Sequence, residues 1–287
     1  MKIKYVILMC ALVVVLGFKS DKPAYVIYGE KGKSVQYKDM LSAALSADIV
    51  FFGEHHDNPI THWLQLELTK DLFEKKQQDL VLGAEMFESD NQLVLDEYIQ
   101  GLIKENKFEA DCRLWPNYKT DYKPLVNFAK ENELKFVASN VPRRYASIVY
   151  KGGFEALQGL TDEAKKYLPP LPITYNGELK CYSDMLNMEG MGHASANLPK
   201  SQNVKDATMA HFILQNWVAG NTLLHYNGAY HSANREGIVW HVLNQNPELK
   251  IVTITTVSQV EVEKLEKDNK GSADFTICVP ETMTSTH

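Results

Sequence analysis

The sequence predicts an α/β protein with a largely parallel sheet flanked by helices, and a mostly helical insertion that caps the sheet edge. Two observations carry this prediction. From residue 48 to residue 257, short apolar runs typical of buried strands alternate with stretches of helical periodicity. Residues 152–200 break this rhythm with Pro169-Pro-Leu-Pro172 and glycine-containing turns, and we assign them to the insertion.

The size and charge of the chain limit its class. With 287 residues, 45% hydrophobic and 23% charged, it can bury a sizeable core, and we expect one domain over residues 21–287. The formal net charge of -6, without a Lys/Arg-rich run, argues against nucleic acid and anionic membranes as partners.

The N-terminus has the pattern of an export signal. Two lysines within residues 1–4 precede an apolar segment, residues 5–18, that is too short to span a bilayer comfortably. We therefore expect a signal peptide over residues 1–20. Cys10 lies inside the apolar segment after Met9, which disfavours it as a lipid-attachment site. Cleavage would leave Cys112, Cys181 and Cys278, whose spacings fit isolated, half-buried thiols rather than a zinc site.

The first half of the chain begins with a hairpin signal, Gly29-Glu-Lys-Gly-Lys33, and then alternates strands with helices. Leucines spaced by four at 64, 68 and 72 give one helix a buried face, and Asp57 or Asn58 can cap it. Ser89-Asp-Asn-Gln92 resembles a capping box. The expected strands are 24–28, 34–37, 49–52, 80–87 and 134–139, and the expected helices are 39–47, 61–76, from 89 to about 102, and from 124 to about 132.

The second half continues the pattern after the insertion. Within the insertion, methionines at 185, 188 and 191, with Tyr175, Tyr182 and His193, suit either a soft wall for a planar ligand or ordinary core. His225 and His241 lie inside predicted elements, which favours structural roles. The expected helices are 204–220 and 236–244, and the expected strands are 221–226, 249–257 and 274–279.

Polar side chains follow several of the predicted strands at the point where each strand ends. In parallel sheets these ends share one edge, where ligands bind. Glu85 lies near the end of an apolar strand, where a carboxylate has to be paired, metal-bound or protonated. We expect Glu88, one residue beyond the strand, to be solvated at the start of the next helix. Arg143 or Arg144 can neutralise a carboxylate, such as Glu85, or simply begin a helix. The converging groups are Glu54 and His56, Glu85, Asn140 and Arg143, and Tyr230 and His231, with His62 nearby.

At these residues the chain resembles the haem-binding uptake, Tiki-like family, also called ChaN-like. The resemblance covers roughly residues 45–257. It rests on Gly53-Glu-His-His-Asp-Asn-Pro59 with His62, Gly83-Ala-Glu-Met-Phe87, Trp115-Pro116, Asp121-Tyr122, Ala138-Ser-Asn-Val-Pro-Arg143, Asp206-Ala-Thr-Met-Ala210 and Gly228-Ala-Tyr-His231.

The resemblance implies an exported bacterial protein, often a lipoprotein, that serves haem or iron uptake. It would be periplasmic or associated with the outer side of the inner membrane. Haem would be its ligand, and a homodimer or an outer-membrane haem receptor its partner. Haem iron needs an axial His or Tyr, for which His56, His62, Tyr230 and His231 are candidates, while Asn140 would contact the ligand and Arg143 a propionate.

The wider superfamily implies an alternative, because its members resemble metal-dependent peptidases and erythromycin esterases. Their Gly-Glu-x-His element, second-strand Glu and Gly-x-x-His element correspond here to Glu54/His56, Glu85 and His231. These four residues would hold a divalent transition metal, with Glu54 or Glu85 as the catalytic general base. A metal-free site that transfers protons is a variant of this hydrolase.

Overall fold

The computed structural model describes residues 22–186 and 195–287. The predicted signal peptide, with Cys10, lies outside the described residues, as do Met188, Met191 and His193 of the insertion. Within the described ranges, no helix is long and apolar enough to cross a membrane. Cys112, Cys181 and Cys278 are free thiols, as predicted, although all three are buried rather than half-buried.

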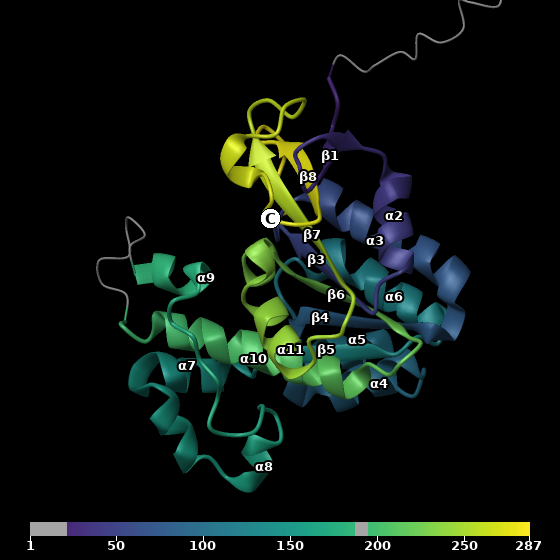
Figure 1. Ribbon diagram of the computed structural model, residues 1–287. Coiled ribbons are helices and arrows are strands. Elements are labelled where there is room, and N and C mark those ends of the chain that lie inside the picture. The colour runs from purple at the N-terminus through teal and green to yellow at the C-terminus, as the bar shows by residue number, and fades with distance from the viewer. Residues whose placement is uncertain (1–21, 187–194) are drawn as a thin grey trace, which may run out of the picture.

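The described strands form one sheet, which confirms the predicted fold class (Figure 1). The strand order is β2-β1-β8-β7-β3-β6-β4-β5, parallel from β8 through to β5 and antiparallel only where β1 meets β2 and β8. The strands are β1 (Val26–Gly29), β2 (Ser34–Val35), β3 (Ile49–Glu54), β4 (Leu80–Glu88), β5 (Phe136–Asn140), β6 (Thr222–Gly228), β7 (Ile251–Gln259) and β8 (Phe275–Pro280).

The helices lie close to their predicted positions. Asn58 caps α3 by accepting hydrogen bonds from the amides of Ile60 and Thr61. Short 3-10 segments η2 (Ser89–Asn91), η4 (Phe154–Gly159) and η6 (Ala229–His231) and a π-helical turn, η3 (Tyr118–Tyr122), join them. The helices are α2 (Tyr37–Leu45), α3 (Pro59–Lys76), α4 (Gln92–Ile99), α5 (Glu105–Asp111), α6 (Lys123–Glu131), α7 (Arg143–Gly152), α8 (Asp162–Lys165), α9 (Lys180–Ser183), α10 (Leu198–Asn216) and α11 (Ile238–Gln245).

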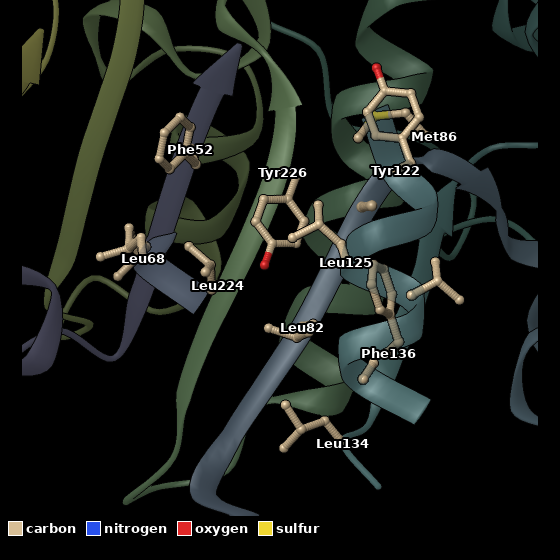
Figure 2. Close-up of a cluster of buried hydrophobic side chains, with 14 of the residues drawn as sticks. Phe52, Leu68, Leu82, Met86, Tyr122, Leu125, Leu134, Phe136, Leu224 and Tyr226 are labelled. Atoms are coloured by element: carbon tan, nitrogen blue, oxygen red, sulfur yellow. The ribbon is translucent and has the colours of Figure 1, made fainter. Parts of the chain in front are cut away.

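Alternate residues of each central strand face opposite sides of the sheet, as the strand geometry requires. In β3, Val50 and Phe52 pack into the large core beneath α2, α3 and α6, whereas Ile49 and Phe51 pack beneath α10 and α11. Figure 2 shows part of the first core, where Tyr226 lies among strand and helix side chains. Apolar side chains therefore cover both faces of the central strands, and the polar groups of the predicted site stand at the strand ends.

Where it is described, the predicted insertion consists of short helices joined by turns and loop, and it lies at the edge of the sheet, where Met185 lines the cavity described below. Figure 1 shows α7, α8 and α9 gathered next to α10, on the side away from α2 and α3. A separate apolar cluster, which includes Tyr145, Leu157 and Val204, holds α7, η4 and α8 against α10. The prediction placed the start of α10 at residue 204, but the helix begins at Leu198 because Pro199, which lacks an N–H, fits the first turn.

The predicted capping box at Ser89 and Gln92 is wrong. The Ser89 hydroxyl donates to the carbonyl of Tyr167 in the insertion, 3.1 Å away. The Gln92 side chain instead donates to the Phe136 carbonyl and accepts from the Ala138 amide. Since β5 is an edge strand, this glutamine pairs backbone groups that have no neighbouring strand. The sequence also gave no expectation of α5.

Candidate functional site

A cavity of about 1210 Å³ opens at the carboxyl ends of β3, β4, β5 and β6. It lies where the sequence placed a ligand site. Except for His62, all the side chains predicted for the site line this cavity: Glu54, His56, Glu85, Asn140, Arg143, Tyr230 and His231.

Glu54 and His56 form the first acid–base pair. The His56 Nδ1 lies 2.9 Å from Glu54 Oε1. The His56 side chain is 38% exposed, whereas the Glu54 carboxylate beneath it is fully buried. The ring edge also packs against Trp115, with centroids 4.9 Å apart. Because Glu54 accepts the Nδ1 proton, the neutral ring carries its lone pair on Nε2, at the cavity side. Burial alone would lower the pKa of His56, but the hydrogen bond to Glu54 and the charge of Glu85 raise it overall.

His62, predicted as a ligand, lies beneath the cavity instead of in its wall. The side chain is buried, with Nδ1 3.2 Å from Gln65 Oε1 and Nε2 3.0 Å from the His56 carbonyl. Both ring nitrogens are therefore occupied, and the ring supports the His56 loop from below. The reason is the first turn of α3, which turns residue 62 inward beside Gln65.

Glu54 is held by more partners than the sequence suggested. Tyr122 donates to Glu54 Oε1 at 2.6 Å, and Gln65 donates to Oε2 at 2.5 Å. These hydrogen bonds fix the carboxylate that orients His56. Tyr122 belongs to the Asp121-Tyr122 motif of the family resemblance, which was the only sequence signal for it; Gln65 had none.

A second chain of groups, Asp206–His231–Glu85, lies across β6 from the first. His231 Nδ1 is 2.5 Å from Asp206 Oδ1, and its Nε2 is 3.2 Å from Glu85 Oε1. The second oxygen of Glu85 accepts the Gly228 amide at 2.8 Å, and Tyr182 donates to Asp206 at 2.7 Å. The sequence placed Asp206 on a helix but assigned it no role.

His231 and Glu85 of this chain are ionised at neutral pH. Burial would lower the pKa of His231, but the flanking charges of Glu85 and Asp206 raise it to about 10. Burial would likewise raise the pKa of Glu85, but the cation of His231 holds it well below its usual range. His231 is therefore a buried cation between two carboxylates, with no lone pair free for a ligand.

The four predicted metal ligands, Glu54, His56, Glu85 and His231, do not form one cluster. In the part of the chain that the structure describes, no group of three or more His, Cys, Asp or Glu side chains is arranged to hold a metal. The alternation of strand residues is the physical reason. Glu54 continues the side of Val50 and Phe52 and meets α3, whereas Glu85 continues the side of Val81 and meets His231 and Asp206 of α10.

Glu88 differs from the prediction, whereas Arg143 begins α7 and neutralises a carboxylate, although not the one named. Glu88 is 4% exposed and is not a solvated group, because Arg113 and Arg143 both donate to its carboxylate. Arg143 therefore neutralises Glu88 and not Glu85, and its side chain is 63% exposed at the cavity wall. The Asn140 side-chain amide donates to the Glu85 carbonyl of the neighbouring strand β4 at 2.9 Å.

Tyr230 lines the cavity and is 39% exposed. Its hydroxyl donates to the carbonyl of Cys181 in α9. Burial, with nearby negative groups, raises the pKa of Tyr230 above its ordinary value. The hydroxyl thus ties the insertion to the sheet and has to leave this carbonyl before it can bind anything else. His225 and His241 lie away from the cavity wall, as predicted, bonded to Ser139 and Asn203 respectively.

Gly228 separates the two acid–base groups, and we expect Gly228→Ala to disturb both. A Cβ there would lie 2.8 Å from His56 Nε2 and 3.5 Å from Glu85 Oε2. Overpacking of this kind costs about 1–3 kcal/mol of unfolding free energy. Urea denaturation measures it, with Gly159→Ala as the control, since a Cβ at residue 159 meets nothing within 4 Å. Equal stability of the two variants would contradict this packing.

Comparison with known proteins places this fold and site in a family. The model for the haem-binding uptake, Tiki superfamily, ChaN family matches residues 40–242. The chain belongs to this family. The match spans β3 to β6 and so includes both acid–base pairs, and it confirms the predicted resemblance.

Solved structures with the same fold include ChaN of Campylobacter jejuni, described in a structure of cofacial haem binding. It superposes with a TM-score of 0.64 at 23% identity, over 88% of this chain and 96% of that one. A Bacillus cereus protein gives a TM-score of 0.51 at 11% identity, over 85% and 90% of the two chains. The chloroplastic protein RETICULATA-RELATED 5 of Arabidopsis thaliana is 26% identical over 186 residues. This match covers 60% of the chain but only a quarter of the plant protein.

Proposed function

We propose that this chain binds haem in the cavity at the carboxyl ends of the strands. The observation that carries the proposal is the cavity itself, whose volume of about 1210 Å³ exceeds the roughly 300–1,000 Å³ typical of small-ligand sites. Membership of a haem-binding uptake family and the fold shared with ChaN of Campylobacter jejuni support this choice of ligand.

The cavity wall fits the chemical needs of haem. A porphyrin needs apolar surfaces beside its faces, and Trp115, Val141 and Met185 provide them. Its propionates need cations, and Arg143 and Lys205 stand at the same wall. The iron, when haem is bound, takes an axial nitrogen or oxygen ligand.

Two of the four predicted ligands remain candidates for the iron. His56 presents Nε2 at the cavity with Glu54 fixing the tautomer, which is how carboxylates usually orient metal-binding histidines. Tyr230 also lines the cavity and can offer its phenol once it leaves the Cys181 carbonyl. His62 and His231 are occupied on both ring nitrogens and serve as supports.

We extend the proposal to the setting of the protein. The N-terminal segment supports export to the periplasm or to the outer side of the inner membrane, where a haem carrier would receive its ligand. A second copy of the chain or an outer-membrane haem receptor would then be the partner in transfer. Cell fractionation of the full-length protein tests the location; recovery in the cytoplasm, uncleaved, would contradict it.

A haemin titration followed by absorbance tests the proposal. We expect a saturable Soret shift at about one haem per chain. Of the variants His56→Ala and Tyr230→Phe, the one that removes the iron ligand should lower the haem affinity by about 10–100-fold. The ligating variant also changes the visible bands, because the iron loses its axial ligand. His211→Ala, a change on the outer surface of α10, is the control. Haem affinity that neither cavity variant alters would contradict the assigned site.

A second candidate function is a metal-free hydrolase, and one observation favours it. Two acid–base pairs, Glu54–His56 and Glu85–His231, face one cavity, which is more proton-transfer chemistry than haem binding requires. His56 would act as the general base and take a proton from water at Nε2, while Glu54 accepts the hydrogen bond from the Nδ1 proton of His56. A screen of chromogenic esters tests this: Glu54→Gln should abolish any turnover that the wild type shows while haem affinity changes little.

A further inference from the structure

Residues 285 and 286 lie against the loop that carries His56, although more than 220 residues separate them in the chain. The Thr286 amide donates to the Asp57 carbonyl at 2.9 Å. The Ser285 hydroxyl donates to the Asp57 carboxylate at 2.8 Å, and this bond leads the effects that lower the pKa of Asp57. Two successive residues thus hold both the backbone and the side chain of one loop residue.

Thr286 also reaches the buried support of the loop. Its hydroxyl donates to Asp121 Oδ2 at 2.7 Å, and Asp121 is 3% exposed. The same carboxylate oxygen accepts the Asn117 amide at 2.8 Å and lies 3.5 Å from His62 Nε2. Asp121 is therefore the meeting point of a surface hydroxyl and two buried donors.

Asn117 and His62 both also contact the backbone carbonyl of His56. Asn117 Nδ2 donates to the His56 carbonyl at 2.8 Å, and His62 Nε2 lies 3.0 Å from the same oxygen. A continuous path of hydrogen bonds thus runs from Thr286 through Asp121 to the backbone of the residue that faces the cavity. The path stays below the cavity wall, and none of Asp121, Asn117 and Thr286 lines the cavity.

We propose that residues 285 and 286 form a strap that positions His56, with Thr286 as the positioning residue. The strap closes the loop between β3 and α3 from the side opposite the cavity. It acts on the direction of the imidazole through Asp121, not by contact with a ligand. The effect on ligand affinity rests on the proposed function, whereas the effect on the loop does not.

Amide hydrogen exchange of the full chain tests the strap without any ligand. Thr286→Val removes the hydroxyl and keeps the shape, and we expect the amides of Asn58 and Thr61 to exchange about tenfold faster, because a bond to a charged group is lost. Thr286→Ser, which restores the hydroxyl, should return exchange to the wild-type rate. Thr284→Val is the matched control, since residue 284 is exposed and makes none of these contacts.

Haemin titration of the same variants supplies the second readout. Where the His56→Ala titration identifies His56 as the iron ligand, we expect Thr286→Val to weaken haem binding about tenfold and to alter the Soret band, while Thr286→Ser and Thr284→Val do neither. Unchanged exchange at Asn58 in Thr286→Val would overturn the strap, and so would faster exchange spread evenly over the sheet. If the wild type fails to bind haemin, the proposed function fails, and the exchange rates still decide the strap.

Discussion

Replacement of His231 by alanine is expected to lower the free energy of unfolding by about 3–5 kcal/mol at pH 7. The change removes a buried cation and leaves the carboxylates of Glu85 and Asp206 without it in the protein interior. Urea denaturation followed by circular dichroism measures the loss. His211→Ala is the control, because His211 is partly exposed and its side chain contacts Gln215 and Phe212 of its own helix α10. A loss no larger than that of the control would contradict a buried ion chain.

His231 also makes the free energy of unfolding depend on pH, and the sign of this dependence follows from its raised pKa. Its pKa rises from 6.5 in the unfolded chain to about 10 in the folded one, so the folded state keeps a proton that the unfolded state releases. This stabilisation is complete below pH 6.5 and is lost as the pH rises towards 10, at roughly 1.4 kcal/mol per pH unit. The lowered pKa of Glu85 has the opposite sign, and its contribution is lost as the pH falls below 4.5.

Unfolding measured from pH 6.5 to 9.5 separates wild type from His231→Ala. We expect the wild type to lose stability steadily over this range, whereas the variant lacks this component and declines less. Parallel decline of the two proteins would contradict the raised pKa of His231.

Replacement of Glu54 by alanine has the second large expected effect. It strands the Tyr122 hydroxyl, the Gln65 amide and the Nδ1 proton of His56, the first two of them buried. Each unpaired buried donor costs about 1–3 kcal/mol, so the two together give an expected loss of about 2–6 kcal/mol. Haem affinity should fall as well, since nothing then fixes the His56 tautomer.

Two further variants give this experiment its controls. Glu54→Gln keeps the volume and one acceptor, and we expect it to lose about half as much stability as Glu54→Ala. Glu67→Ala, on the exposed side of the same α3 helix, removes only a surface pair with Lys70 and should change stability by less than about 0.5 kcal/mol. Similar losses for alanine at positions 54 and 67 would contradict the bonding around Glu54.

The sequence predicted the sheet and the position of the cavity because both follow from local patterns. Apolar runs mark the strands, and parallel strands bring their ends together. The alternation that separates Glu54 from Glu85 is also local, but which helix covers each side depends on the strand order. Glu54 on β3 therefore faces α3, whereas Glu85 on β4, separated from β3 by β6, faces α10. In the described residues the single metal cluster inferred from motif spacing does not form.

The remaining corrections come from long-range pairing, which no local pattern encodes. Arg113, distant in sequence, brings Glu88 inside together with Arg143. The Gln92 side chain hydrogen-bonds the backbone of edge strand β5 at Phe136 and Ala138, so it is not available to form a capping box with Ser89. Thr286 reaches Asp57 and Asp121 only because β8 runs beside β7 and returns the chain to the site.

A crystal structure of the protein saturated with haemin tests the central claim most directly. We expect a porphyrin in the cavity between Trp115 and Met185, with its propionates towards Arg143 and Lys205. The iron should be coordinated by His56 Nε2 or by the Tyr230 phenol. A porphyrin bound outside this cavity, or coordinated by neither side chain, would contradict the proposed haem site.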